Sequence, residues 1–240
     1  MARTALVTGA NRGLGLEFVR QLLARGDHVV AACRQPGKAA ALNLLGGEHP
    51  GRLHVLPLDV ASAKSREELA RELPLALGEG ERLDLLVNNA GVLHGGERFG
   101  QLRQDALEDS LRTNALGPLL LTQALAPLLA DGRGRAPWPV VANLSSQLGS
   151  IANVARFGTP GYAIGKAAQN MATAQLAQAL APRGIVVLAL HPGWAQTDMG
   201  GPRAPDPVDA VVAGLLRIVD AATPAQSGRF LDWRGHALPW

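Results

Sequence analysis

The chain of 240 residues contains one cysteine, Cys33, and therefore cannot form an intramolecular disulfide. A lone cysteine is typical of proteins from a reducing compartment. Prolines and charged residues interrupt every apolar run before it reaches the length of a membrane span. The opening residues, MARTALVTGA, lack the charged start and long apolar core of a signal peptide. These absences predict a cytoplasmic protein with no membrane span.

A concentrated charge and a metal-ligand spacing are also missing. The formal net charge is only +3, and the basic residues are scattered rather than interleaved with aromatic residues. Nucleic-acid binding is therefore not expected. The six histidines show no HxH or HxxxH pairing, so the sequence predicts no metal site.

What the sequence does contain is an alternation of short apolar runs with longer helical patterns. This alternation is typical of βαβ units, in which helices cover both faces of a parallel sheet. No repeat or low-complexity linker divides the chain, so we expect one domain over residues 1–240. Strands are predicted at residues 4–8, 28–32, 53–58, 83–87, 140–144, 185–189 and near 230, and helices at 14–24, 38–45, 65–77, 105–129, 162–180 and 207–219.

Single residues refine these helices. Ser62, Asp105 and Asp206 are candidate N-caps, because their side-chain oxygens can accept from the free N–H groups of a first turn. Pro118 and Pro127 interrupt the long pattern over residues 105–129 and predict a kink or an early end there. Met171 is expected on the core side of its helix.

The first predicted strand runs into a glycine loop, TGANRGLG at residues 8–15. Gly9 permits a tight turn, Gly13 lets backbone approach a ligand, and Gly15 allows the following helix to pack closely on the sheet. The helix start then offers N–H groups and a positive dipole to a pyrophosphate. The loop therefore predicts a dinucleotide site that also includes Asn11, Arg12 and Leu14, with a ligand-free glycine turn as the alternative.

The end of the second predicted strand lacks an acidic residue. A carboxylate at this position usually holds the ribose 2′-hydroxyl of NAD, whereas this chain has Ala32, Cys33 and Arg34. Arg34, together with Arg12 of the glycine loop, can instead bind a 2′-phosphate. The sequence therefore favours NADP(H) over NAD(H), the alternative being two solvated arginines.

A tyrosine and a lysine four residues apart, Tyr162 and Lys166, share one face of the predicted helix over residues 162–180. An adjacent ammonium favours the ionised phenol, so we expect Lys166 to pull the pKa of Tyr162 from about 10 towards neutrality. A tyrosine tuned in this way can pass a proton at neutral pH. The pair therefore predicts acid–base catalysis.

The chain resembles the short-chain dehydrogenase/reductase family along nearly its whole length. The matching segments are TGANRGLG (8–15), LDV (58–60), NNAG (88–91), TNALG (113–117), NLSS (143–146), YAIGK (162–166) and HPGWAQTD (191–198). SSQLGSI (145–151), QTDMGG (196–201) and the segment 228–240 look like the C-factor and sniffer-type carbonyl reductases. The resemblance implies a Rossmann-like, doubly wound parallel sheet of seven strands with helices on both faces.

The resemblance also implies a catalytic tetrad of Asn114, Ser146, Tyr162 and Lys166. In these roles Tyr162 is the acid or base, Ser146 binds the carbonyl oxygen, Lys166 binds the nicotinamide ribose, and Asn114 holds a water in a proton relay. Ser146 lies sixteen residues before Tyr162, further than in many family members, a spacing that the sniffer-type branch shares. Ser145 remains the alternative.

Further cofactor contacts are implied at the ends of the later strands. Asp59 and Val60 are expected at the adenine, although Asp59 could also simply end its strand. The remaining contacts are expected from Asn88, Ala90, Gly91, Pro192, Gly193 and Thr197.

The substrate side is expected at the short Gly- and Pro-containing loop over residues 194–205, where glycines can act as hinges. Trp194, Leu148 and Phe157 are candidate walls for a small carbonyl or alcohol substrate. Trp233 and Trp240 are expected to pack against the domain or a partner subunit. By resemblance, the helices over 105–129 and 162–180 form the interface of a homodimer or higher homo-oligomer.

The function expected from these residues is NADPH-dependent reduction of a ketone, aldehyde or quinone. A signalling or redox-sensing protein of C-factor type with little turnover is the first alternative. An epimerase or dehydratase is the second, and the short stretch over residues 192–240 argues against it, since those enzymes usually carry a longer substrate region.

Overall fold

The computed structural model describes residues 2–78 and 80–240. These residues form a seven-stranded parallel sheet with the strand order β3-β2-β1-β4-β5-β6-β7. The expected Rossmann-like α/β fold is confirmed, and the strand ends lie within two residues of their predicted positions. The strands are β1 (Thr4–Thr8), β2 (His28–Cys33), β3 (Leu53–Pro57), β4 (Leu85–Asn88), β5 (Val140–Leu144), β6 (Val186–His191) and β7 (Phe230–Asp232).

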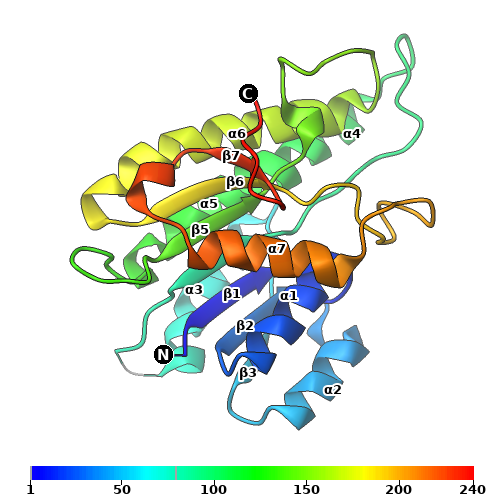
Figure 1. Cartoon of the computed structure of the whole chain (residues 1–240). Helices are drawn as coiled ribbons and strands as arrows, with labels where there is room; N and C mark the ends of the chain where they lie inside the picture. Colours follow the sequence, from blue (N-terminus) through cyan, green and yellow to red (C-terminus); the bar gives the residue numbers. More distant parts are fainter. Residues whose placement is uncertain (1, 79) are drawn as a thin grey trace.

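Helices cover both faces of the sheet (Figure 1). One apolar core joins the sheet to α1 (Gly13–Ala24), α2 (Ala40–Glu48) and α7 (Val208–Asp220). The other core joins it to α3 (Ala63–Leu77), α5 (Gly117–Leu125) and α6 (Pro160–Leu180), while α4 (Gln104–Leu111) packs on α6. Because side chains alternate along a strand, Ala5 and Val7 of β1 enter the first core and Leu6 enters the second.

The long helix expected over residues 105–129 is divided into four parts. After α4 comes a π-helical turn, Arg112–Leu116, then α5 and a short 3₁₀ helix, Ala126–Leu128. Pro118 lies in the first turn of α5 and Pro127 in the 3₁₀ helix, where their missing N–H groups cost little. The predicted interruption is confirmed. Four more 3₁₀ helices occur at Pro36–Lys38, Gln147–Gly149, Ala181–Arg183 and Pro224–Gln226.

One of the three predicted N-caps is confirmed. Ser62 caps α3, and its hydroxyl accepts from the N–H of Ser65 at 3.3 Å. The other two predictions are wrong. Asp105 lies inside α4, whose N-cap is Arg103. Asp206 precedes Pro207, the N-cap of α7, and its carboxylate accepts instead from the N–H of Trp194 at 2.9 Å.

The two tryptophans near the C-terminus pack on the fold as expected. Trp240 stacks on Phe230 with ring centroids 5.5 Å apart, and its backbone carbonyl accepts from the N–H of Ala152 at 3.0 Å. Trp233 packs against the first apolar core. This segment therefore contacts the loop that follows β5, which carries the predicted catalytic serine.

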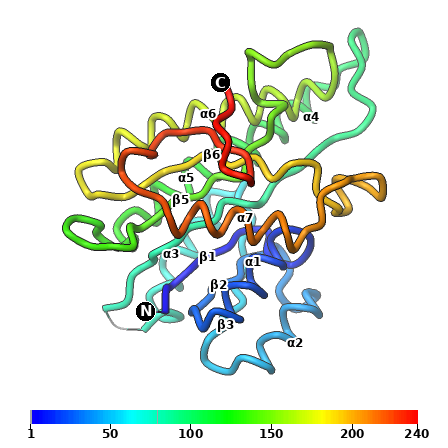
Figure 2. The backbone as a smooth tube through the Cα atoms, in the orientation of Figure 1, coloured from blue at the N-terminus to red at the C-terminus, as the bar shows by residue number. Residues whose placement is uncertain are grey.

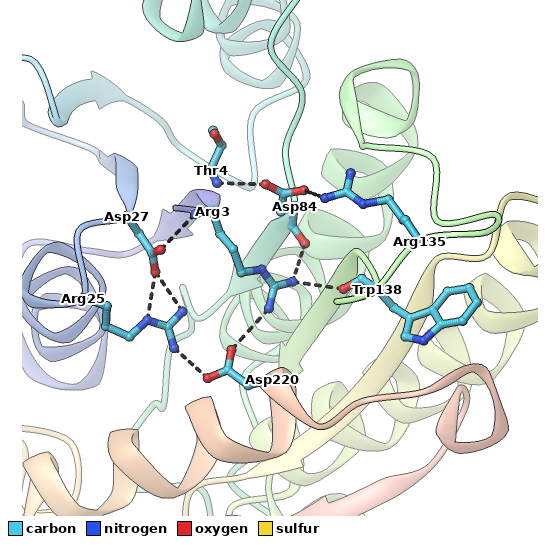
Figure 3. Close-up of polar contacts among 8 residues, drawn as sticks. All are labelled: Arg3, Thr4, Arg25, Asp27, Asp84, Arg135, Trp138 and Asp220. Atoms are coloured by element: carbon cyan, nitrogen blue, oxygen red, sulfur yellow. Dashed lines mark hydrogen bonds and ion pairs between the residues drawn. The ribbon is translucent and has the colours of Figure 1, made fainter. Parts of the chain in front are cut away.

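At the amino-terminal edge of the sheet, a buried arginine joins four parts of the chain (Figure 3). The guanidinium of Arg3 donates to the carbonyl oxygens of Asp84 and Trp138, both at 3.0 Å, and pairs with Asp220 of α7 at 3.3 Å. Arg25, which follows α1, also pairs with Asp220, at 2.8 Å. The network fixes the edge of the sheet that lies opposite the glycine loop.

None of the helices among residues 2–78 and 80–240 is long and apolar enough to cross a membrane.

Candidate active site

The glycine loop follows β1 at the carboxyl edge of the sheet, and its tight geometry requires its glycines. Gly9 has a positive φ of 62°. A Cβ on Gly15 would lie 2.3 Å from the carbonyl oxygen of Gly9, so no side chain fits there. Asn89 holds this arrangement, because its side-chain amide donates to the carbonyls of Thr8 at 2.8 Å and Gly9 at 3.2 Å.

Asn89 and Thr8 are functional residues that the sequence reasoning missed. The hydroxyl of Thr8 accepts from the N–H groups of Asn89 and Ala90, both at 3.0 Å, and so ties the end of β1 to the end of β4. Both residues belong to segments that matched the family pattern. The motifs therefore contained these two residues, but their role in joining β1 to β4 becomes visible only when the two strands lie side by side.

The first turn of α1 suits an anion. Its N-cap, Arg12, makes no side-chain capping bond, and the turn contains no acidic residue. The free N–H groups and the helix dipole therefore remain available to a phosphate. Asn11 is exposed beside them, while Leu14 packs against the first apolar core. These features fit the pyrophosphate of a dinucleotide.

The two arginines considered for a 2′-phosphate are both exposed. The guanidinium of Arg12 pairs with Asp198 at 3.0 Å, which joins the glycine loop to the loop after β6. Arg34 lies just beyond the end of β2. No acidic residue occupies the end of β2, which agrees with the sequence argument for NADP(H).

At the expected adenine end, Asp59 is exposed, and its carboxylate accepts from the N–H of Ala61 at 3.0 Å. This bond closes the turn after β3, which matches the alternative that Asp59 ends its strand. The other carboxylate oxygen makes no bond in this turn. Val60 is buried, and its carbonyl accepts from the guanidinium of Arg66 at 2.6 Å.

Three of the expected cofactor contacts lie at or just after the end of β4, and their surroundings differ: Asn88, Ala90 and Gly91. The side chain of Asn88 is buried and donates to Asn143 at 2.8 Å and to Thr122 at 3.2 Å. Its amide is therefore bound to neighbours within the fold. Ala90 lies against Gly9, since a Cβ added to Gly9 would be 3.0 Å from the Cα of Ala90.

Ser146, rather than Ser145, lies towards Tyr162, the predicted acid or base. The hydroxyl of Ser146 lies close enough to Tyr162 to lower the pKa of its phenol, and it accepts from the N–H of Leu148 at 3.1 Å. The hydroxyl of Ser145 donates instead to Asn170 at 2.5 Å inside the protein. Consecutive residues of an extended segment point to opposite sides, so only one of the two serines can reach the tyrosine.

Lys166 is only 3% exposed, and its ammonium donates to the carbonyl of Leu144 at 2.5 Å and to Gln169 Oε1 at 2.9 Å. Nζ lies 5.6 Å from the centroid of the Tyr162 ring. Burial lowers the pKa of Lys166 to about 7. Two acceptors, one from β5 and one from α6, therefore hold the ammonium beside the tyrosine.

The expected lowering of the tyrosine pKa is wrong for the protein in this state. Burial raises the pKa of Tyr162 to about 12, and the hydrogen bond from Ser146 opposes the rise only in part. The loss of water around the phenol outweighs the nearby lysine, because Lys166 itself loses its charge more easily when buried. The spacing of the pair can be seen in the sequence, but the burial that raises the tyrosine pKa cannot.

The π turn places Asn114 beside the pair. Its side chain is buried, accepts from the N–H of Val92 at 2.8 Å and donates to the carbonyl of Val92 at 2.9 Å. A Cβ on Gly91 would lie 3.0 Å from Asn114 Oδ1 and 3.8 Å from Lys166 Nζ. Gly91 therefore allows the amide and the ammonium to approach each other from two elements. Single π turns are frequent at functional sites.

The loop over residues 194–205 lies next to the glycine loop at the carboxyl edge (Figure 2). Gly193 follows Pro192 and has a positive φ of 72°. A Cβ on Gly193 would lie 2.5 Å from Asp206 Oδ2, so no side chain fits there. Thr197 faces the glycine loop, because its Cγ2 would lie 3.3 Å from a Cβ on Gly13. Its hydroxyl accepts from the N–H of Gly200 at 3.1 Å.

The candidate wall residues are apolar and exposed around this edge: Leu148 (49%), Phe157 (53%) and Trp194 (52%). Phe157 packs edge-to-face on Phe99 with ring centroids 5.6 Å apart, which brings in a residue that the sequence reasoning missed. The indole of Trp194 donates to the carbonyl of Gly200 at 2.7 Å and so is fixed to its own loop. Among the described residues no group of three or more His, Cys, Asp or Glu side chains could hold a metal ion.

Comparisons with known proteins agree with this geometry. A family model described as short chain dehydrogenase matches residues 3–207. The structure of an NADPH-bound carbonyl reductase from chicken fatty liver is 36% identical, with a TM-score of 0.93 over 100% of this chain and 99% of that chain. The carbonyl reductase Sniffer of D. melanogaster is 32% identical, with a TM-score of 0.92 over 100% of both chains. C-signal of Myxococcus xanthus is 46% identical over 100 residues, which span 42% of this chain and 60% of that protein.

Proposed function

We propose that this chain, which belongs to the short-chain dehydrogenase family, is an NADP(H)-dependent carbonyl reductase acting on ketones, aldehydes or quinones. One observation carries the proposal. Tyr162 lies between Ser146 and the buried ammonium of Lys166, 5.6 Å from its ring centroid, at the sheet edge that also holds an uncapped, glycine-rich helix start. The carbonyl reductase from chicken fatty liver, to which the fold is similar, is described as NADPH-bound.

The cofactor would lie along the carboxyl edge of the sheet. The free N–H groups of α1 would hold its pyrophosphate, and Arg34 would meet a 2′-phosphate with Arg12. Asp59 and Val60 would border the adenine, with Gly91, Gly193 and Thr197 towards the nicotinamide. When bound, the cofactor supplies or accepts a hydride at the substrate carbon.

The chain's own residues would handle the proton. Because the pKa of Tyr162 is about 12, its hydroxyl is fully protonated at neutral pH and can donate to the developing alkoxide. Ser146, which lies close to the phenol of Tyr162, would hold the same oxygen in line. Lys166 would bind the ribose hydroxyls and, through Asn114 and water, replace the proton that Tyr162 gives up.

The proposal is tested by titrating the protein with NADPH and NADH separately, then following NADPH oxidation with a panel of aldehydes, diketones and quinones. We expect tighter binding of NADPH and turnover of several carbonyls. Tyr162→Phe should retain NADPH binding and lose turnover by at least about 100-fold, the order of a lost general acid. Preference for NADH would contradict the role of Arg34 and Arg12, and wild-type turnover by Tyr162→Phe would contradict the mechanism.

A signalling role is the second candidate, and the similarity to C-signal over 100 residues favours it. Such a protein would bind the dinucleotide and turn over little. The same variant separates the two. A biological effect that survives Tyr162→Phe with NADPH binding intact supports signalling, and an effect lost with turnover supports catalysis.

We also propose that the chain forms a homodimer through α5 and α6. Leu116, Leu120, Ile164 and Met171 are 36–63% exposed on the π turn, α5 and α6. The expectation that Met171 faces the core is wrong, because it lies two residues from the buried Thr173 and hence on the other side of α6. Light scattering that gives a monomer mass at all working concentrations would refute the dimer.

A further inference from the structure

A buried glutamine contacts the catalytic lysine from the next turn of α6. Gln169 is 1% exposed, and its Oε1 accepts from the ammonium of Lys166 at 2.9 Å. The other acceptor of that ammonium is the carbonyl of Leu144, which β5 fixes in place. Gln169 is therefore the one side chain among the described residues that accepts a hydrogen bond from the lysine.

This glutamine is present at a cost to stability. Its side-chain Nε2 is buried and has no hydrogen-bond partner among the described residues. A buried donor without a partner is destabilising, whereas a leucine of similar volume would fill the same space without one. A leucine could not, however, accept the hydrogen bond that Lys166 donates to Gln169.

We propose that Gln169 is a positioning residue that keeps Lys166 charged and aimed at the nicotinamide side of the site, an inference that rests on the proposed reductase function. With two N–H groups of the ammonium committed to Leu144 and Gln169, the third is left for a ribose hydroxyl or water. The open side is bounded by the Tyr162 ring, 5.6 Å from Nζ, and by Gly91, whose added Cβ would lie 3.8 Å from Nζ.

The protonation of Lys166 is sensitive to a single acceptor. Its pKa of about 7 means that the charged and neutral forms are nearly balanced at neutral pH. Of the groups around Nζ, Tyr162 on α6 titrates, while the Leu144 carbonyl on β5, Gly91 after β4 and Asn114 on the π turn do not. Removing Gln169 Oε1 should therefore lower the ratio of charged to neutral lysine about tenfold, since a hydrogen bond to an ion is among the stronger ones.

The first test observes Lys166 directly. The chain has only three lysines, Lys38, Lys64 and Lys166, and the first two are exposed. Carbon-13 labelling of the lysine side chains therefore gives three NMR signals to follow against pH, with Lys38→Arg and Lys64→Arg assigning them. We expect Lys166 to titrate at least one pH unit lower in Gln169→Leu than in wild type, and higher than wild type in Gln169→Glu. Identical titration of Lys166 in Gln169→Leu and wild type would overturn the proposal.

The second test separates positioning from simple packing. Gln169→Leu should melt at the wild-type temperature or above it, bind NADPH within about threefold of wild type, and keep its KM for the carbonyl while kcat falls about tenfold. Gln169→Glu should recover most of kcat. Gln178→Leu, on the exposed side of the same helix, is the matched control and should change none of these.

Two other results have distinct meanings. A lower melting temperature in Gln169→Leu, with kcat unchanged, would show a packing residue and refute the proposal. If the wild-type protein reduces no carbonyl, the proposed function fails, and the lysine titration still decides whether Gln169 holds the charge.

Discussion

The network around Arg3 allows a prediction of stability that is independent of the active site. The Arg3 side chain is 7% exposed and donates to two backbone carbonyls and to Asp220 (Figure 3). Burial lowers the pKa of Arg3, and the neighbouring carboxylates of Asp220 and Asp84 oppose that shift. Arg3→Met keeps most of the aliphatic length and removes the guanidinium, so it probes the hydrogen bonds and the charge.

The expected loss follows from what each partner retains. The carbonyl of Asp84 still accepts from the N–H of Val140 at 2.9 Å, and Asp220, 47% exposed, keeps its pair with Arg25. The carbonyl of Trp138 loses its side-chain donor. An unsatisfied buried group costs about 1–3 kcal/mol, and the half-exposed ion pair adds about 0–1 kcal/mol. We therefore expect Arg3→Met to lower the free energy of unfolding by about 1–4 kcal/mol.

Equilibrium urea unfolding measures this loss, and calorimetry should show a melting temperature lower by roughly 2–16 °C for a chain of this size. Arg133→Met is the matched control, because Arg133 also pairs with a carboxylate, that of Asp131, but is 71% exposed. That variant should unfold like wild type. NADPH binding should be unchanged in both, since the network lies at the opposite edge of the sheet. A loss in Arg3→Met no larger than in Arg133→Met would refute the reasoning.

Two further predictions concern titratable groups. Burial lowers the pKa of His191 to about 4 from its usual 6.5, so between these values the unfolded chain binds a proton that the folded protein does not. The contribution of His191 to the free energy of unfolding should therefore be fully present above pH 6.5 and fall by up to about 3 kcal/mol as the pH drops to 4. Urea unfolding at several pH values should show this pH dependence in the wild type and not in His191→Gln. Tyr162 is the only tyrosine, and its pKa is raised to about 12. Ultraviolet absorbance should therefore detect almost no tyrosinate at pH 10 in the folded protein, and half-ionisation at that pH would contradict the burial of the phenol.

The fold could be predicted from the sequence because the sheet is buried on both faces. Strands such as β5 and β6 are continuous apolar runs bounded by polar or glycine-containing loops, and their positions follow from composition alone. The π turn Arg112–Leu116 could not be predicted, since no residue preference distinguishes one extra residue in a helical turn. Its effect is local but important, because it directs Asn114 towards Val92 and brings it near Lys166.

The site residues could be located along the chain but not oriented. The motif over residues 143–146 predicted a serine, yet whether Ser145 or Ser146 faces Tyr162 depends on how β5 ends. Asn88 was placed at the correct strand end, but its side chain points into the sheet because side chains alternate there. Gln169 carried no signal at all, since one glutamine in a helix is unremarkable until its neighbours are known.

A buried polar chain that runs between Asn88 and Gln169 joins α6 to the sheet. The side chain of Asn88 donates to Asn143 at 2.8 Å, and Asn143 donates to Thr173 at 2.9 Å. The hydroxyl of Thr173 donates in turn to the backbone carbonyl of Gln169, whose side chain meets Lys166.

Towards its other end α6 is held by apolar contacts, among them those of Leu176 and Leu180. Apolar packing tolerates small slides and rotations, whereas hydrogen bonds fix both distance and direction. Unpaired atoms remain at both ends of the polar chain, Asn88 Oδ1 and Gln169 Nε2, and each lowers stability. The part of α6 that carries Lys166 is thus held in register with β4 and β5 by hydrogen bonds, the less stabilising but more directional of the two kinds of contact. The proposed role of Gln169, which is to aim the Lys166 ammonium, depends on this directionality.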